Sequence, residues 1–128
     1  MNKSHIEHYQ QAALFKWRDK QLKVYPQLKW MYATVNSSKL TPRQGAWLKS
    51  EGKRKGVWDI FLPHPSGNYC GLWIEMKSGK NGLTEEQKEF REDLKEYYCF
   101  AVCYSAKEAE ESIIKYFGLI NQQSENRQ

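Results

Sequence analysis

The architecture of this chain follows from the segment Gly71-Leu-Trp-Ile-Glu-Met-Lys-Ser-Gly-Lys-Asn-Gly-Leu-Thr-Glu-Glu-Gln-Lys-Glu-Phe90. In its first half, apolar side chains alternate with others that include Glu75 and Lys77, and this period of two predicts a β-strand. A glycine-containing turn follows. Thr84 and Gln87 then have the spacing of a helix capping box, in which each side chain bonds the backbone N–H of the other residue. The segment therefore predicts a strand, a tight turn and a helix.

Glu75 and Lys77 are two residues apart on this strand, so both side chains project from the same face of the sheet. Burying such charges costs several kcal/mol each unless they pair or bind a metal. Two interpretations are open at this point: an ion pair at a sheet edge, and a functional site.

Length and composition indicate one globular domain. The chain has 128 residues, of which 40% are hydrophobic, enough for one core. We expect the domain to span residues 1–118 and a polar tail to follow at 119–128. No apolar run is long enough to span a membrane and no signal-peptide core begins the chain, so a soluble protein is expected. Cys70, Cys99 and Cys103 contain no Cys-x-x-Cys pair, and we expect them to be reduced, as in an intracellular protein.

The net charge of +5 is consistent with a polyanionic partner. Basic residues concentrate at Lys53, Arg54 and Lys55, whereas the helix that Thr84 opens has an acidic surface. A basic cluster beside a candidate site favours nucleic-acid binding, and a solvated basic loop is the alternative.

Capping signals, apolar periodicity and turn residues predict an alternation of helices and strands along the chain. The predicted helices are 4–20, 41–51, one beginning at Thr84, and 105–116, and the predicted strands are 28–36, 57–62, 72–77 and 100–104. We expect the second and third strands to form a hairpin. The predicted fold class is α/β, with a mixed central sheet of about four strands flanked by helices.

The first helix has an apolar stripe at helical spacing, which we expect to face the core: Ile6, Tyr9, Ala13 and Trp17. Glu7 lies at the edge of this stripe, where it is either the capping partner of Ser4 or a functional side chain. In the second helix we expect Trp47 and Leu48 to supply the apolar contacts.

Two polar side chains interrupt apolar patterns elsewhere. Asp59 lies within an otherwise apolar strand, where a carboxylate is costly to bury without a partner. Gln87 falls on the apolar face of its helix, although a capping partner of Thr84 needs no further role. Because local rules are broken most often at functional sites, we group Asp59 and Gln87 with Glu75 and Lys77.

Two carboxylates on neighbouring strands suit a hard divalent cation such as Mg²⁺ or Mn²⁺, which prefers oxygen ligands. Such a metal polarises a phosphate and lowers the pKa of a bound water, and a nearby lysine stabilises the developing charge. The group of side chains therefore predicts hydrolysis of a phosphodiester bond.

The same residues resemble the signature of PD-(D/E)XK nucleases, and a longer set resembles the virus-type replication–repair nuclease (VRR-NUC) domain in its stand-alone phage form. That set is Arg54-Lys-Gly56, Asp59-Ile-Phe-Leu62, Ile74-Glu-Met-Lys-Ser78 and Gly82-Leu-Thr-x-x-Gln87. The resemblance covers most of residues 4–104 and implies a restriction-endonuclease-like core. The family usually has proline before the aspartate, where this chain has Trp58, which packs in the core or contacts DNA.

The resemblance implies a role for each residue that matches. Asp59, Glu75 and the backbone carbonyl of Met76 would bind the metal, and Lys77 would act on the attacking water. Gln87 would support the site from its helix.

Outside this centre, Glu7 would match a first-helix glutamate that can join the metal shell. Lys53, Arg54 and Lys55 would contact DNA phosphates. The implied function is an Mg²⁺- or Mn²⁺-dependent DNA endonuclease that acts on branched DNA such as Holliday junctions. The implied protein is a homodimer in the cytoplasm of a phage host or a bacterium, with no membrane or organic cofactor.

Two alternatives remain open: a nicking or restriction-type endonuclease on duplex DNA, and a non-catalytic DNA-binding module of the same fold. The presence of Asp59, Glu75 and Lys77 together argues against the second. Trp30 and Tyr32, like Trp47, either pack in the core or serve an interface.

Overall fold

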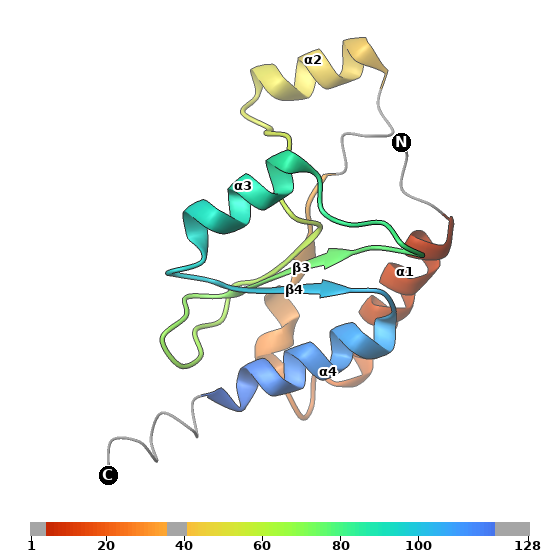
Figure 1. Cartoon of the computed structure of the whole chain (residues 1–128). Helices are drawn as coiled ribbons and strands as arrows, with labels where there is room; N and C mark the ends of the chain where they lie inside the picture. The colour runs from red at the N-terminus through yellow and green to blue at the C-terminus, as the bar shows by residue number, and fades with distance from the viewer. Residues whose placement is uncertain (1–4, 36–40, 120–128) are drawn as a thin grey trace.

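The computed structural model describes residues 5–35 and 41–119 (Figure 1). In chain order its elements are α1 (His5–Lys20), the 3₁₀-helix η1 (Pro26–Trp30), β1 (Tyr32–Ala33), α2 (Pro42–Ser50), β2 (Ile60–Leu62), β3 (Leu72–Met76), α3 (Glu85–Leu94), β4 (Cys99–Cys103) and α4 (Ala106–Phe117). The predicted cap at Ser4, the end of the predicted strand at Asn36 and tail residues 120–128 lie outside the described residues.

Within these residues, the strands form one mixed sheet in the order β1-β2-β3-β4. β1 and β2 are antiparallel, β2 and β3 form an antiparallel hairpin, and β4 runs parallel to β3. α3 supplies the crossover that a parallel pair of strands requires. The predicted mixed sheet with its hairpin and flanking helices is confirmed.

One face of the sheet carries the main hydrophobic core. Leu72, Ile74 and Met76 of β3 are at most 1% exposed, and α1 and α4 cover them (Figure 1). Leu14 of α1 and Ile113 of α4 are fully buried in the same cluster. Burying each such aliphatic side chain contributes about 2 kcal/mol, so this layer holds the sheet in place.

The opposite face lies under α3 and carries a layer of aromatic rings. Phe61 stacks on Trp73 with ring centroids 4.3 Å apart, and Phe90 of α3 meets Trp73 edge to face at 5.0 Å. Because Trp73 and Glu75 point from the same face of β3, the aromatic layer continues directly into a polar region.

The buried face of α1 differs from the prediction. Ile6 and Tyr9 are 62% and 68% exposed, whereas Glu7 and Leu14 are buried. The predicted stripe is therefore wrong in the first half of the helix, whereas Trp17 packs against the core as expected. A polar contact helps to orient the helix: Ser78 Oγ donates to Glu7 Oε2 at 2.7 Å. Apolar spacing alone cannot indicate that a glutamate is directed inward by a partner far along the chain.

The strand predicted at residues 28–36 is also wrong over most of its length. η1 occupies its first part, and β1 has only two residues. The Arg18 guanidinium donates to the carbonyl oxygens of Leu28 at 3.3 Å and Met31 at 2.8 Å, which stabilises a helical turn in this segment.

The caps of α2 are confirmed, but its predicted apolar contacts are not. Thr41 Oγ1 accepts from Gln44 N at 3.1 Å, and Gln44 Oε1 accepts from Thr41 N at 3.0 Å. Gly52, with φ of 98°, follows the helix as its stop. Trp47 is 71% exposed and α2 has no buried residue, so the expectation that Trp47 contacts the core is wrong.

The three cysteines lie in the described part and are free thiols, with Cys103 buried in the core and Cys70 exposed. None of the described helices combines the length and the apolar character needed to cross a membrane. The domain boundary at 118/119 stays a prediction, because most of the predicted tail lies outside the described residues.

Candidate active site

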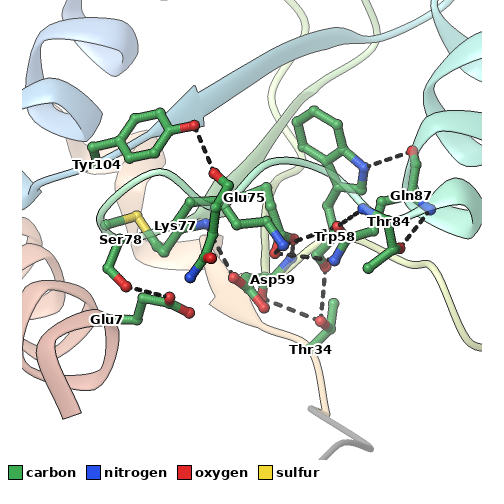
Figure 2. Close-up of polar contacts among 12 residues, drawn as sticks. Glu7, Thr34, Trp58, Asp59, Glu75, Lys77, Ser78, Thr84, Gln87 and Tyr104 are labelled. Carbon is green, nitrogen blue, oxygen red and sulfur yellow. Dashed lines mark hydrogen bonds and ion pairs between the residues drawn. The ribbon is translucent and has the colours of Figure 1, made fainter. Parts of the chain in front are cut away.

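The two candidate carboxylates meet where the β2–β3 ladder ends. The last regular pair is Ile60 with Ile74, and one further step of the same register places Asp59 opposite Glu75. There, Glu75 Oε1 accepts from Asp59 N at 3.1 Å, and Asp59 Oδ2 accepts from Met76 N at 3.0 Å (Figure 2). Because side-chain bonds replace backbone bonds at this step, β2 begins at Ile60 and is shorter than the predicted strand.

Lys77 completes a buried polar cluster with Glu75 and Gln87 (Figure 2). Lys77 Nζ lies 3.4 Å from Glu75 Oε2 and donates to Gln87 Oε1 at 3.0 Å, while Gln87 Nε2 donates to Glu75 Oε2 at 3.1 Å. The side chains of Glu75 and Lys77 are only 4% and 12% exposed. β3 is an interior strand, so the interpretation as an edge ion pair is wrong. Buried pairs give little net stability, which leaves function as the better reason for this one.

Gln87 forms the predicted capping box and also bonds the charged side chains of β3, while its support of a catalytic site stays a prediction. Its side-chain Oε1 also accepts from Thr84 N at 2.9 Å, and its backbone N–H donates to Thr84 Oγ1 at 3.2 Å. Together these two bonds form the predicted capping box of α3. The side-chain amide therefore ties the first turn of α3 to the lysine and the glutamate of β3.

Trp58 packs in the core, which decides between its two predicted fates. It is fully buried, its Nε1 donates to the Gln87 carbonyl oxygen at 3.0 Å, and its ring meets Phe100 edge to face at 4.9 Å. From the other side, Thr34 Oγ1 donates to the carbonyl oxygens of Trp58 at 2.8 Å and Asp59 at 3.2 Å. Asp59 is thus fixed by contacts from β3 and from Thr34, the residue that follows β1.

Sequence reasoning missed the structural roles of Ser78 and Thr34. Ser78 is buried against Glu7, so α1 is fastened to the end of β3 beside Lys77 (Figure 2). Its place directly after the lysine was a usable signal, because a buried hydroxyl needs a partner. Thr34 offered no signal beyond its β-branched side chain. Tyr104, also unassigned from the sequence, donates its hydroxyl to the carbonyl oxygen of Asn81 at 2.8 Å, in the turn after β3.

The donor set fits a hard divalent cation. Asp59 and Glu75 supply carboxylate oxygens and Met76 a carbonyl oxygen, and Mg²⁺ is commonly held by one or two carboxylates together with waters and substrate phosphates. Among residues 5–35 and 41–119, no three His, Cys, Asp or Glu side chains gather at a possible metal site. Glu7 therefore does not form a trio with the carboxylate pair. This set does not fit a closed zinc site, which takes four protein ligands.

The predicted DNA-binding residues lie on the surface, a few positions before Asp59 in the chain. Lys53 and Arg54 are exposed, and Lys55 Nζ lies 3.4 Å from Glu86 Oε1. A backbone hydrogen bond and the neighbouring Lys55 ammonium lower the pKa of Glu86. Such an exposed ion pair contributes little to stability, so Lys55 is available to exchange this partner for another anion.

The fold is similar to that of a solved structure described as a VRR_NUC domain protein, with a TM-score of 0.75. The two chains are 28% identical, and the match covers 92% of this chain and 93% of the other. No family model matches the chain, and no curated protein sequence matches it. The nearly complete coverage agrees with the ordered motif set that contains Asp59, Glu75, Lys77 and Gln87. In its fold and its ordered motif residues, the chain is therefore similar to VRR-NUC nuclease-type domains.

Proposed function

We propose that this chain is a metal-dependent DNA endonuclease that hydrolyses phosphodiester bonds. The observation that carries the proposal is the buried polar cluster in which Asp59 and Glu75 meet at one register position, with Lys77 held against Glu75 by Gln87. Such a group of charges under a helix and beside an aromatic layer has no structural benefit that matches its cost.

Asp59, Glu75 and the carbonyl oxygen of Met76 are the residues proposed to hold Mg²⁺ or Mn²⁺. When bound, the cation supplies polarisation of a phosphate oxygen and a lowered pKa for a water molecule. A role for Glu7 as a further ligand stays a prediction, since its carboxylate is bonded to Ser78.

Lys77 is the residue proposed to act on the attacking water and on the charge that develops on the phosphate. Its ammonium group lies between Gln87 Oε1 and Glu75 Oε2 (Figure 2). A donor that is already oriented stabilises the transition state without reorganisation at the moment of reaction. Gln87 is the positioning residue that supplies this orientation.

Lys53, Arg54 and Lys55 are proposed to contact the DNA backbone near the polar cluster, through charge attraction that weakens with salt. A DNA substrate also suits an intracellular location, which is part of the proposal.

A branched substrate and a homodimer complete the proposed function. Symmetric cutting of a four-way junction needs two active sites, which a two-fold dimer provides. Trp30, at the end of η1, and Tyr32, in the edge strand β1, are 68% and 50% exposed. They supply apolar area for an interface, and sedimentation of the purified chain measures the oligomer directly.

The test is Mg²⁺-dependent cleavage of labelled four-way junction, flap, nicked and linear DNA. Asp59→Ala and Lys77→Ala should each reduce the cleavage rate at least about 100-fold while DNA binding changes little. Retained cleavage in either variant would refute the assigned roles. Glu75→Ala should abolish Mn²⁺ binding in calorimetry, and unchanged affinity would contradict ligation. Equal rates on junction and plain duplex would favour the nicking or restriction-type alternative, and absence of cleavage would favour a non-catalytic module.

A further inference from the structure

α2 stands apart from both layers of the fold (Figure 1). None of its residues is buried, and it makes no extensive contact with another helix or strand of the described residues. Its own capping box and Pro42 stabilise it locally. Trp47 on this helix is 71% exposed, the highest value among the large apolar side chains that the structure describes. Tryptophan is enriched at binding interfaces, because it combines a large apolar ring system with a hydrogen-bond donor.

The positive charge of the molecule is concentrated on the same segment. We call residues 41–56 the basic arm. It contains five basic side chains and one acidic one, so it carries four of the five net positive charges of the chain. Arg43, Lys49, Lys53 and Arg54 are all exposed. Arg43 precedes Trp47 by four residues, so the two side chains lie on one face of α2.

The basic arm ends at the candidate active site. Gly56 is packed so tightly against α3 that a Cβ atom there would lie 2.7 Å from the carbonyl oxygen of Glu86. Glu86 directly precedes Gln87, and Trp58 and Asp59 follow Gly56 after one residue. A polyanion that lies along the arm would therefore reach the polar cluster that contains Asp59.

We infer that the basic arm binds DNA at a position where a base is unpaired or unstacked. Its lysine and arginine side chains contact phosphates, and the Trp47 indole stacks on the open face of the base. This inference rests on the proposed nuclease function, and it adds Trp47 as the side chain that recognises an exposed base in the branched substrate. An aromatic side chain stacks on any base, but only where a neighbouring base does not already cover that face. Branch points, flaps and single strands offer such faces, and the interior of an intact duplex does not.

Charge favours nucleic acid over a second copy of the chain as the occupant of this helix. Two basic arms placed against each other would oppose four net positive charges on each side, and like charges across an interface are unfavourable. DNA instead releases counterions when lysine and arginine neutralise its phosphates.

The stacking part is tested by fluorescence anisotropy without divalent metal, so that no DNA is cut. The probes are a labelled forked DNA with unpaired arms and a blunt duplex of equal length. Trp47→Ala should weaken binding to the forked DNA about tenfold and binding to the blunt duplex less than twofold. Trp47→Phe, which keeps an aromatic face, should restore most of the affinity, whereas Trp47→Leu should not. Tyr97→Ala, which removes another exposed aromatic side chain beyond the far end of α3, should leave both affinities unchanged.

The phosphate part is tested by the salt dependence of the same binding. Arg43→Ser and Lys49→Ser should each weaken binding to both probes and reduce the slope of log affinity on log salt concentration by about 0.9. Lys107→Ser on α4, which covers the other face of the sheet, should leave the slope unchanged.

Wild-type affinity of Trp47→Ala for the forked DNA would overturn the inference, as would an equal loss on both probes. A change in sedimentation mass in this variant would also overturn it and assign the helix to a second copy. These outcomes are separate from the proposed function, because binding is measured without cleavage. If the wild-type chain cuts DNA and Trp47→Ala binds and cuts every substrate as well as the wild type does, the inference about the basic arm is wrong and the proposed nuclease function is kept. If no cleavage is found but the binding differences are, the nuclease fails while the arm remains a DNA-binding element.

Discussion

At the scale of single residues, the side-chain amide of Gln87 makes three of the hydrogen bonds in the site. Its oxygen accepts from Thr84 N and from Lys77 Nζ, and its nitrogen donates to Glu75. One side chain thus completes a helix cap and orients two charged groups. A substitution at this position acts on folding and on chemistry at once, and a matched variant is needed to separate the two.

Gln87→Ala should lower the free energy of unfolding by about 2 kcal/mol, because it removes a cap and hydrogen bonds to charged groups. It should also lower the cleavage rate at least about tenfold, since Lys77 loses its orienting acceptor. Thr84→Ala is the control: it loses the Thr84 Oγ1 bond to Gln87 N and about 1 kcal/mol, but keeps the amide in the site. Urea unfolding and single-turnover cleavage measure both quantities. Equal losses of rate in the two variants would show that Gln87 acts only as a cap.

Two buried tryptophan nitrogens give a second comparison at this scale. Trp58 Nε1 donates to the Gln87 carbonyl oxygen, whereas Trp73 Nε1 is buried and, among the described residues, has no hydrogen-bond partner. Trp58→Phe should therefore be more destabilising than Trp73→Phe by about 1 kcal/mol, since both lose similar ring area but only one loses a hydrogen bond. Chemical denaturation measures the difference, and the reverse order would contradict the Trp58 bond.

Contacts between residues close together in the sequence could be predicted, whereas contacts between distant residues could not. The capping boxes at Thr41 and Thr84 were predictable, because both partners lie within one helical turn. The bond between Glu7 and Ser78 joins residues 71 positions apart, so no local pattern contains it. The aligned pair Asp59 and Glu75 was predicted as a group, but the register that sets them opposite each other became visible only in the sheet.

At the scale of elements, the contact between the end of the basic arm and α3 determines where the N-terminus of α3 lies. Gly56 has φ of 98° and approaches the backbone of Glu86, one residue before Gln87. Gly52 has the same φ but open space around it. The two glycines share a backbone conformation that other residues adopt with strain and differ only in their surroundings.

Gly56→Ala should cost at least about 2 kcal/mol, because backbone strain adds to a clash that must displace α3. Gly52→Ala should cost only about 1 kcal/mol, the strain alone. Thermal unfolding measures both. Hydrogen exchange at the first turn of α3 should rise only in Gly56→Ala, and equal protection in the two variants would mean that the arm does not position α3.

Element boundaries were less predictable than element types. Every predicted helix that lies in the described residues is present, because caps and stop signals are local. The strand at 28–36 was wrong because Arg18, on another element, bonds the carbonyl oxygens of Leu28 and Met31. Trp47 was expected to make apolar contacts because tryptophan is usually at least partly buried. Nothing in the sequence shows that α2 lies away from the sheet.

At the scale of the whole molecule, the two faces of the sheet separate stability from chemistry. The face under α1 and α4 holds the aliphatic core, and the face under α3 holds the aromatic layer and the polar cluster (Figure 1). The fold class was predictable because strand periodicity and the βαβ order determine it. The orientation of α1 and the exposure of α2 depend on contacts among distant elements, which periodicity does not contain.

Two buried acidic groups in the α4 layer predict how stability depends on pH. Burial raises the pKa of the Tyr116 hydroxyl and of the Cys103 thiol. The unfolded chain therefore releases these protons at lower pH than the folded chain does. Stability from these groups is fully present below their unfolded pKa values, about 8.5 for cysteine and 10 for tyrosine, and is lost as the pH rises through and above them.

Tyr116→Phe should lower the free energy of unfolding by about 1 kcal/mol at pH 7, because the hydroxyl donates to the carbonyl oxygen of His64 at 2.6 Å. The decline of stability between pH 9 and 11 should be shallower in this variant, since the Tyr116 hydroxyl no longer contributes to it. Urea unfolding across this range measures the slope, and an unchanged slope would exclude Tyr116 as its source.

Where the β2–β3 ladder ends beside Ile60, two backbone amide groups of the polar cluster can report on the state of its carboxylates. The amide protons of Asp59 and Met76 each point at a carboxylate oxygen of the opposing strand. Chemical shifts of amide protons respond to the electron density of their acceptors. In a nitrogen-15 spectrum, these two resonances would register the arrival of a cation at the carboxylates, so occupancy could be followed without a dye, a label on DNA or a single turnover.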